Sequence, residues 1–154
     1  MGFLKKIFKL KTKTTAGLFH HTTLRARIRD IYKDSKIILR DRRYAALSLK
    51  DFLEFQKIAR GKKRLKYERE KFDCDDFAIT YWADIKRAWA KIHKGAESLA
   101  CGIVDGEFIS KTDEKPFRHT MIWVFTKQGT IVFIEPQADF VPFYDVKYIF
   151  RLEG

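Results

Sequence analysis

The residue best suited to chemistry is a cysteine at the start of a predicted helix. Cys74 lies in the segment 72–78, Phe-Asp-Cys-Asp-Asp-Phe-Ala, at the beginning of a run with helical spacing. A thiol in the first turn of a helix faces the positive end of the helix dipole, which stabilises the nucleophilic thiolate. Cys74 therefore suits a nucleophile, although a free cysteine is also a common small core residue. Cys101, inside a predicted strand, is expected to be such a core residue.

Acidic residues surround Cys74. Asp73, Asp75 and Asp76 would all disfavour a thiolate beside them, so a positive group is expected nearby, either a protonated histidine or a bound cation. The oxygens of Asp75 and Asp76 are hard ligands and suit calcium better than zinc. The alternative is that the acidic residues only cap the helix, with Asp73 at its N-cap.

A predicted β-hairpin carries the residues that could assist the thiol. Its strands, 120–125 and 130–134, are joined by Thr-Lys-Gln-Gly. A three-residue loop with Gly129 in the left-handed conformation would pair Thr126 with Thr130. His119 would then lie on the same face as Glu135, as a base and the carboxylate that orients it. A two-residue loop would move Glu135 to the other face, so both registers stay open.

The remaining pattern predicts helices first and an antiparallel sheet afterwards, which is typical of the α+β class. Apolar residues recur at helical spacing in 22–32, 48–59 and, most clearly, 73–93. Residues 36–44 read as an extended segment and a turn. Short strands rich in β-branched and aromatic residues follow at 99–104, 120–125, 130–134 and 145–152, the first of them ended by Asp105-Gly106.

Composition and charge predict the partners and the location of the protein. The net charge of +12 is concentrated in residues 1–70, which hold 21 Lys+Arg and 7 Asp+Glu, a balance of +14. Such a segment attracts anionic partners, namely nucleic acid, a membrane surface or a larger assembly such as a virus particle. Without a signal peptide or an apolar run of membrane-spanning length, a cytoplasmic or virion-associated protein is expected. We divide the chain into a basic amphipathic arm, 1–21, and one domain, 22–154.

These motifs together resemble a known family. The residues that carry the resemblance are Asp41-Arg-Arg-Tyr44, Tyr67-Glu68, the segment 72–78, Gly102-Ile-Val, His119 and Glu135-Pro-Gln137. They resemble the papain-like C-terminal domain of the fairy-ring mushroom agglutinin and its microbial and phage relatives. The resemblance covers roughly four fifths of the chain. It implies a papain-like fold, with the nucleophile at the N-terminus of the central helix.

The resemblance also implies an activity. By position, Cys74 would be the nucleophile, His119 the general base and Glu135 its orienter in a calcium-dependent cysteine peptidase that hydrolyses amide bonds in a peptide or protein. The resemblance makes Asp75, Asp76 and Gln137 the expected metal ligands. A cell-wall peptide amidase and a transglutaminase-like acyl transferase are enzymatic alternatives. The alternative of a different class is a non-catalytic papain-like scaffold whose basic half binds nucleic acid or a phage particle.

Overall fold

Each helix has an apolar stripe that a sheet face can cover, and the two central strands, 101–110 and 116–125, have runs of residues that are buried on both faces. A computed structural model describes residues 16–60, 73–112, 114–138 and 144–154. The elements in chain order are β1 (Gly17–His20), α2 (His21–Ile31), β2 (Lys36–Ile38), β3 (Arg43–Ala46), α3 (Leu49–Arg60), α4 (Cys74–Ile92), β4 (Ser98–Leu99), β5 (Cys101–Ser110), β6 (Pro116–Phe125), β7 (Ile131–Ile134) and β8 (Tyr144–Glu153).

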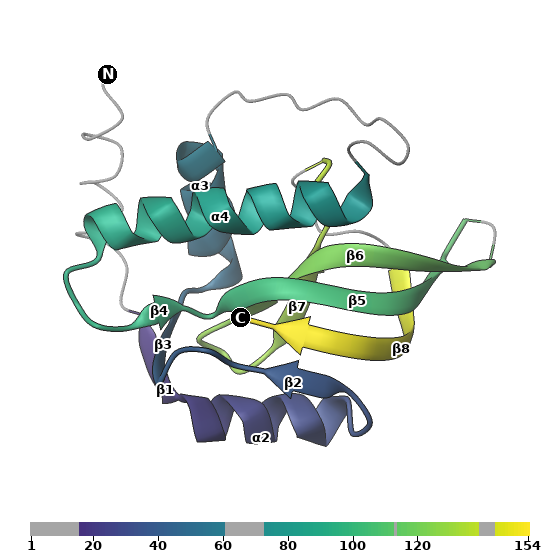
Figure 1. Ribbon diagram of the computed structural model, residues 1–154, viewed down its shortest axis with the longest axis horizontal. Coiled ribbons are helices and arrows are strands. Elements are labelled where there is room, and N and C mark those ends of the chain that lie inside the picture. Colours follow the sequence, from purple (N-terminus) through teal and green to yellow (C-terminus); the bar gives the residue numbers. More distant parts are fainter. Residues whose placement is uncertain (1–15, 61–72, 113, 139–143) are drawn as a thin grey trace.

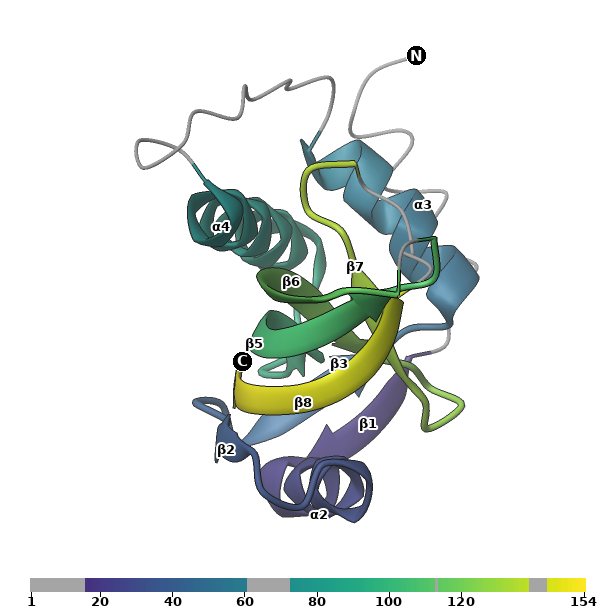
Figure 2. The same cartoon turned by 90° about the vertical axis from the view of Figure 1, so that its right-hand side faces the viewer.

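The described strands form two sheets. The larger has the order β2-β8-β5-β6-β7, and the smaller has the order β1-β3-β4. Most neighbours are antiparallel, but β2 runs parallel to β8 and β3 runs parallel to β4. Figure 1 shows α4 lying across one side of β5 and β6 while α2 lies on the opposite side, and Figure 2 shows α3 beside α4.

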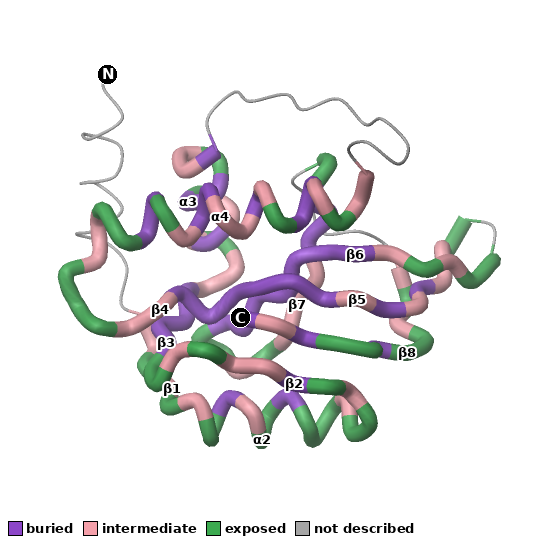
Figure 3. Tube along the Cα trace, in the orientation of Figure 1, coloured by how far each residue is buried: buried purple, intermediate pink, exposed green. Residues whose placement is uncertain are grey.

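The core has one cluster on each side of the larger sheet, because successive residues of a strand point to opposite faces. Along β6, Ile122 and Val124 face the cluster that includes α3 and α4, whereas Met121 and Trp123 face the cluster that includes α2. Figure 3 shows the buried residues concentrated along β5 and β6, which are therefore the centre of the fold.

The row of buried apolar side chains along α4 confirms the predicted central helix. Asp73 stands at its N-cap and His93 at its C-cap, as the 73–93 prediction requires. The side chains packed inward, Ala78, Tyr81, Ile85, Ala88 and Trp89, recur at spacings of three and four residues. The helices predicted at 22–32 and 48–59 also form, each displaced by one residue at either end.

The predicted order of elements is wrong. Strands β1, β2 and β3 precede α3 and α4, and two of the sheet contacts are parallel, so the architecture is mixed α/β with two sheets and not helices followed by an antiparallel sheet. The early strands are short, and their partner strands lie far along the chain. Lys36 pairs with Arg151, and Tyr44 pairs with Ser98. Local periodicity carries no information on such pairing.

The expected turn at Asp105-Gly106 is also wrong. Strand β5 continues through it to Ser110, and its register against β8 shifts between Asp105 and Gly106. A Cβ atom at Gly106 would lie 2.7 Å from the carbonyl oxygen of Tyr148. The glycine thus permits a close approach of two backbones at a bulge, which is a second common use of glycine in strands.

The predicted basic arm lies partly outside the described residues and partly in the smaller sheet. Residues 1–15, most of the arm, are outside the described residues. The last part of the predicted arm, Gly17–His20, is strand β1 and pairs with β3. Among the described residues, no helix has the length and apolarity that crossing a membrane requires.

Candidate functional site

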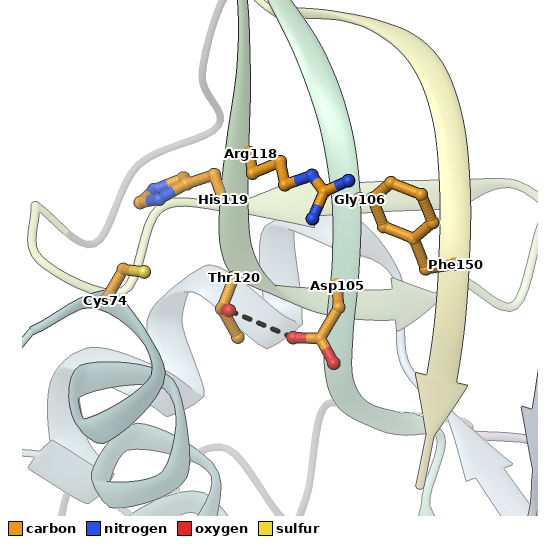
Figure 4. A pocket seen from close by; sticks show the side chains of 7 residues that line it. All are labelled: Cys74, Asp105, Gly106, Arg118, His119, Thr120 and Phe150. Atoms are coloured by element: carbon orange, nitrogen blue, oxygen red, sulfur yellow. Dashed lines mark hydrogen bonds between the residues drawn. The ribbon is translucent and has the colours of Figure 1, made fainter.

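A pocket of about 380 Å³ opens where α4 stops covering the sheet. On β6 the row of side chains beneath the helix, Val124 and Ile122, continues as Thr120 and Arg118 beyond the first residue of α4, Cys74. The pocket is lined by Cys74, Asp105, Gly106, Arg118, His119, Thr120 and Phe150 (Figure 4). The N-terminal end of α4 and interior residues of β5, β6 and β8 therefore meet at this pocket.

Cys74 is the first residue of α4 and is partly exposed. Figure 4 shows its sulfur directed toward the strand that carries His119 and Thr120. The helix dipole is strongest at this turn and favours a negative charge on the thiol. The placement predicted for Cys74 and His119, on facing elements around one site, is thus observed.

The predicted contact between His119 and Glu135 is confirmed. Their Nε2 and Oε2 atoms lie 2.7 Å apart, and both side chains are largely buried. The three-residue loop is observed as well: the Thr126 N–H donates to the Thr130 carbonyl, and Gly129 has a φ of 84°. Because Glu135 occupies Nε2, the other ring nitrogen, Nδ1, is left for a group in the pocket.

Arg60, which the sequence did not single out, supports the loop that holds Glu135. Its Nη1 donates to the carbonyl of Pro136 at 3.1 Å, and its guanidinium lies 4.5 Å from the ring centre of Tyr81. Desolvation lowers the pKa of Arg60. Through this arginine the end of α3, the middle of α4 and the residue after Glu135 are fixed relative to one another.

The floor of the pocket is a set of paired polar groups on β5, β6 and β8. Asp105 accepts a hydrogen bond from the Thr120 hydroxyl at 2.9 Å and one from Arg151 Nε at 3.0 Å. These residues were not predicted, because the two contacts cross strands that are 15 and 46 residues apart along the chain. The alternation of charged and apolar residues in the strands was the only signal that pointed to them.

The predicted metal ligands are only partly brought together. The described His, Cys, Asp and Glu residues whose ligand atoms converge, within 4.8 Å of one another, are Asp73, Cys74 and Asp75. Asp76 lies outside this group, and its Oδ2 accepts the N–H of Asp73 at 3.4 Å. Gln137 is exposed, and its N–H donates to Glu135 Oε1 at 3.2 Å. Within the group, Asp73 Oδ1 is buried without a hydrogen-bond partner.

Comparison with known proteins gives structural neighbours but no sequence relatives. No family model matches the chain, and no curated protein sequence matches it. One similar solved structure is a PSL1a–E64 complex, with a TM-score of 0.66 and 22% identity over 87% of this chain. Another is Polyporus squamosus lectin bound to a human-type influenza-binding epitope, Neu5Acα2-6Galβ1-4GlcNAc, with a TM-score of 0.59 and 23% identity over 86% of this chain.

This chain spans about half of each neighbour, 49% of the first and 45% of the second. At this level of identity the likeness establishes a shared fold. The ligand that each whole neighbour binds is a property of that neighbour, and the shared fold does not assign it to this chain.

These neighbours correct the assignments that rested on the family resemblance. They are lectin chains, and neither is described as a papain-like protease or a phage protein. The papain-like family, the cysteine peptidase activity, the peptide or protein substrate and the nucleic-acid or virion partner are therefore wrong as predicted, and so is the non-catalytic papain-like scaffold. The physical reason is that short sequence motifs describe local surroundings, and local surroundings do not define an activity.

Cys101 should make the stability of the protein depend on pH in the alkaline range. Burial raises the pKa of the Cys101 thiol to about 12, from 9.0. Between these values the unfolded chain loses a proton that the folded chain keeps, so stability falls as pH rises above 9. We expect Cys101→Ala to make this fall shallower by up to about 1.4 kcal/mol per pH unit. Urea unfolding of both proteins at several pH values from 8 to about 10.5 measures it. Parallel curves would contradict the assignment.

Proposed function

We propose that the pocket binds a ligand through a nucleophilic thiol, with Cys74 as the attacking group, His119 as its proton carrier and Glu135 as the residue that orients His119. The observation that carries the proposal is that a cysteine at a helix N-terminus and a histidine paired with a buried glutamate line one pocket. A thiol becomes reactive when a base and a positive helix end stabilise its thiolate.

The chemistry of the site follows from its atoms. The Cys74 proton passes to Nδ1 of His119, while the carboxylate of Glu135 accepts the N–H at Nε2 and stabilises the imidazolium. The thiolate then forms a bond to an electrophilic carbon. With an epoxide, one C–S bond forms, one ring C–O bond breaks, and the released oxygen takes the proton held by His119. The neighbour in complex with E64, an epoxide reagent for thiols, supports testing this ligand class here.

E64 should modify Cys74 and leave Cys101 unmodified, because Cys101 is fully buried while Cys74 opens into the pocket. Mass spectrometry of the labelled protein should show one adduct, mapped to Cys74. His119→Ala should slow the reaction by about 100-fold. Glu135→Gln should slow it less, since it removes only the orienting charge.

Two matched variants control this labelling. Cys74→Ser should give no adduct, and Cys101→Ala should react as fast as the unmodified protein. Equal labelling of both cysteines, or no labelling of Cys74 at neutral pH, would sink the proposal.

Calcium binding at the start of α4 is a second element of the proposal, with Asp75, Asp76 and Gln137 as ligands. Asp73 Oδ1, buried and without a hydrogen-bond partner beside Asp75, is an unused hard oxygen that would fit such an ion. Calcium takes six to eight oxygen ligands, so backbone carbonyls and water would complete the set. The bound charge would offset the carboxylates that surround Cys74.

Calcium should therefore raise the thermal stability of the protein. At an ion concentration of 100 times the dissociation constant the gain is about 2.7 kcal/mol. Thermal unfolding with calcium, with magnesium and with a chelator measures the effect, and Asp75→Asn should remove it. An unfolding midpoint that is the same in calcium and in chelator would rule this ion out.

The lectin neighbours give a second candidate function, which is glycan binding in the same pocket. The observation that favours it is Phe150, whose ring lines the pocket and remains 38% exposed. Partly exposed aromatic rings are common contact surfaces for ligands that combine apolar and polar faces. The Neu5Ac-containing trisaccharide bound to the Polyporus squamosus lectin is the natural probe.

On this candidate, the trisaccharide should protect Cys74 from alkylation, because sugar and reagent would compete for one pocket. Phe150→Ala should lose the protection, and Leu18→Ala, which removes an exposed apolar side chain of β1 outside the pocket lining, should keep it. The rate of iodoacetamide labelling with and without the sugar measures both. An unchanged rate at high sugar concentration would rule out binding of this glycan in the pocket.

A further inference from the structure

The charges that line the pocket are unevenly compensated. Glu135 is paired with His119, and Asp105 is paired with Arg151 at 2.8 Å. Arg118, in contrast, forms no ion pair with any residue in the described part of the chain. Its cross-strand neighbour Glu107 binds Lys147 instead. An arginine in this position is a cation whose charge is available to a ligand.

A contact with an aromatic ring directs this cation. The guanidinium carbon of Arg118 lies 5.1 Å from the ring centre of Phe150, and both residues line the pocket. Figure 4 shows the Arg118 side chain extending across β5 toward Phe150, while Cys74 lies on the other side of the pocket. Stacking on a ring leaves the edge N–H groups of a guanidinium free to donate, and these match the two oxygens of a carboxylate.

The opposite side of the pocket has the opposite charge. Asp73 and Asp75 flank Cys74 at the start of α4. A ligand that reaches the thiol therefore lies between an acidic helix end and an uncompensated arginine. This polarity favours a negative group on the ligand at the strand side, away from the helix.

We propose that Arg118, held on the ring of Phe150, binds a carboxylate of the ligand and selects ligands that carry one next to the carbon attacked by Cys74. The proposal rests on the thiol function proposed above and names the ligand class of the same pocket. Arg118 is a specificity-determining residue in this scheme, because it touches the ligand but neither holds nor moves the reacting proton.

Iodoacetate and iodoacetamide test this selection, because they deliver nearly the same group to the thiol and differ by one negative charge. The quantity to measure is the ratio of their alkylation rates at Cys74. Mass spectrometry monitors both reactions at low salt. The ratio cancels changes in the intrinsic reactivity of the thiol. We expect Arg118→Gln to lower the iodoacetate-to-iodoacetamide ratio by about three-fold, and we expect 0.5 M salt, at about a 4 Å screening length, to reduce that difference.

Lys91→Gln is the matched control, because it removes the same charge from the last turn of α4, at the opposite end of the helix from Cys74, and Lys91 does not line this pocket. Its ratio should equal that of the unmodified protein, and Arg118→Lys should retain part of the preference. If Arg118→Gln and the unmodified protein give the same ratio, the role of Arg118 is overturned, but the thiol function of Cys74 is not. Failure of both reagents to modify Cys74 would overturn the thiol function itself.

Discussion

The contact of α4 with β5 and β6 positions the whole pocket. The helix buries Tyr81, Ile85 and Trp89 in the core cluster that it shares with β5 and β6, each ten residues long. Burying large apolar side chains of this kind contributes about 2 kcal/mol each. Because the helix begins at Cys74, short of the strand ends, part of the sheet stays uncovered beside the thiol. The same packing that stabilises the fold thus creates the pocket.

Pairing of charges organises the pocket once α4 is in place. A buried carboxylate is costly unless it is paired, and Glu135 is paired with His119 while the loop after it is held by Arg60. Asp105 is held between Thr120 and Arg151 on neighbouring strands. With both acids satisfied internally, the groups left for a ligand are the Cys74 thiol, Nδ1 of His119 and the Arg118 guanidinium.

The lectin neighbours limit what this arrangement implies. The structural match covers 87% and 86% of this chain, while the chain itself covers only about half of each lectin. One fold can carry different activities, since activity depends on the side chains of a site. For this reason the thiol chemistry proposed for the pocket is derived from Cys74, His119 and Glu135 themselves, and glycan binding is a separate candidate with its own probe.

The sequence by itself determined the local features of the site. It located the central helix, its cap at Asp73 and the buried character of Cys101, because helical periodicity and strand alternation are short-range properties. It reduced the hairpin to two registers, and the structure shows the one that brings His119 to Glu135.

Tertiary structure decided which segments pair across the chain. The parallel contacts of β2 and β3, the bulge at Gly106 and the meeting of Asp105 with Arg151 depend on strands that are far apart in sequence. Arg118 shows the difference most clearly. In the sequence it is one of 32 basic residues. Only the fold places it on the ring of Phe150 without an ion-pair partner among the described residues, whereas Asp105 and His119 in the same pocket are paired with Arg151 and Glu135.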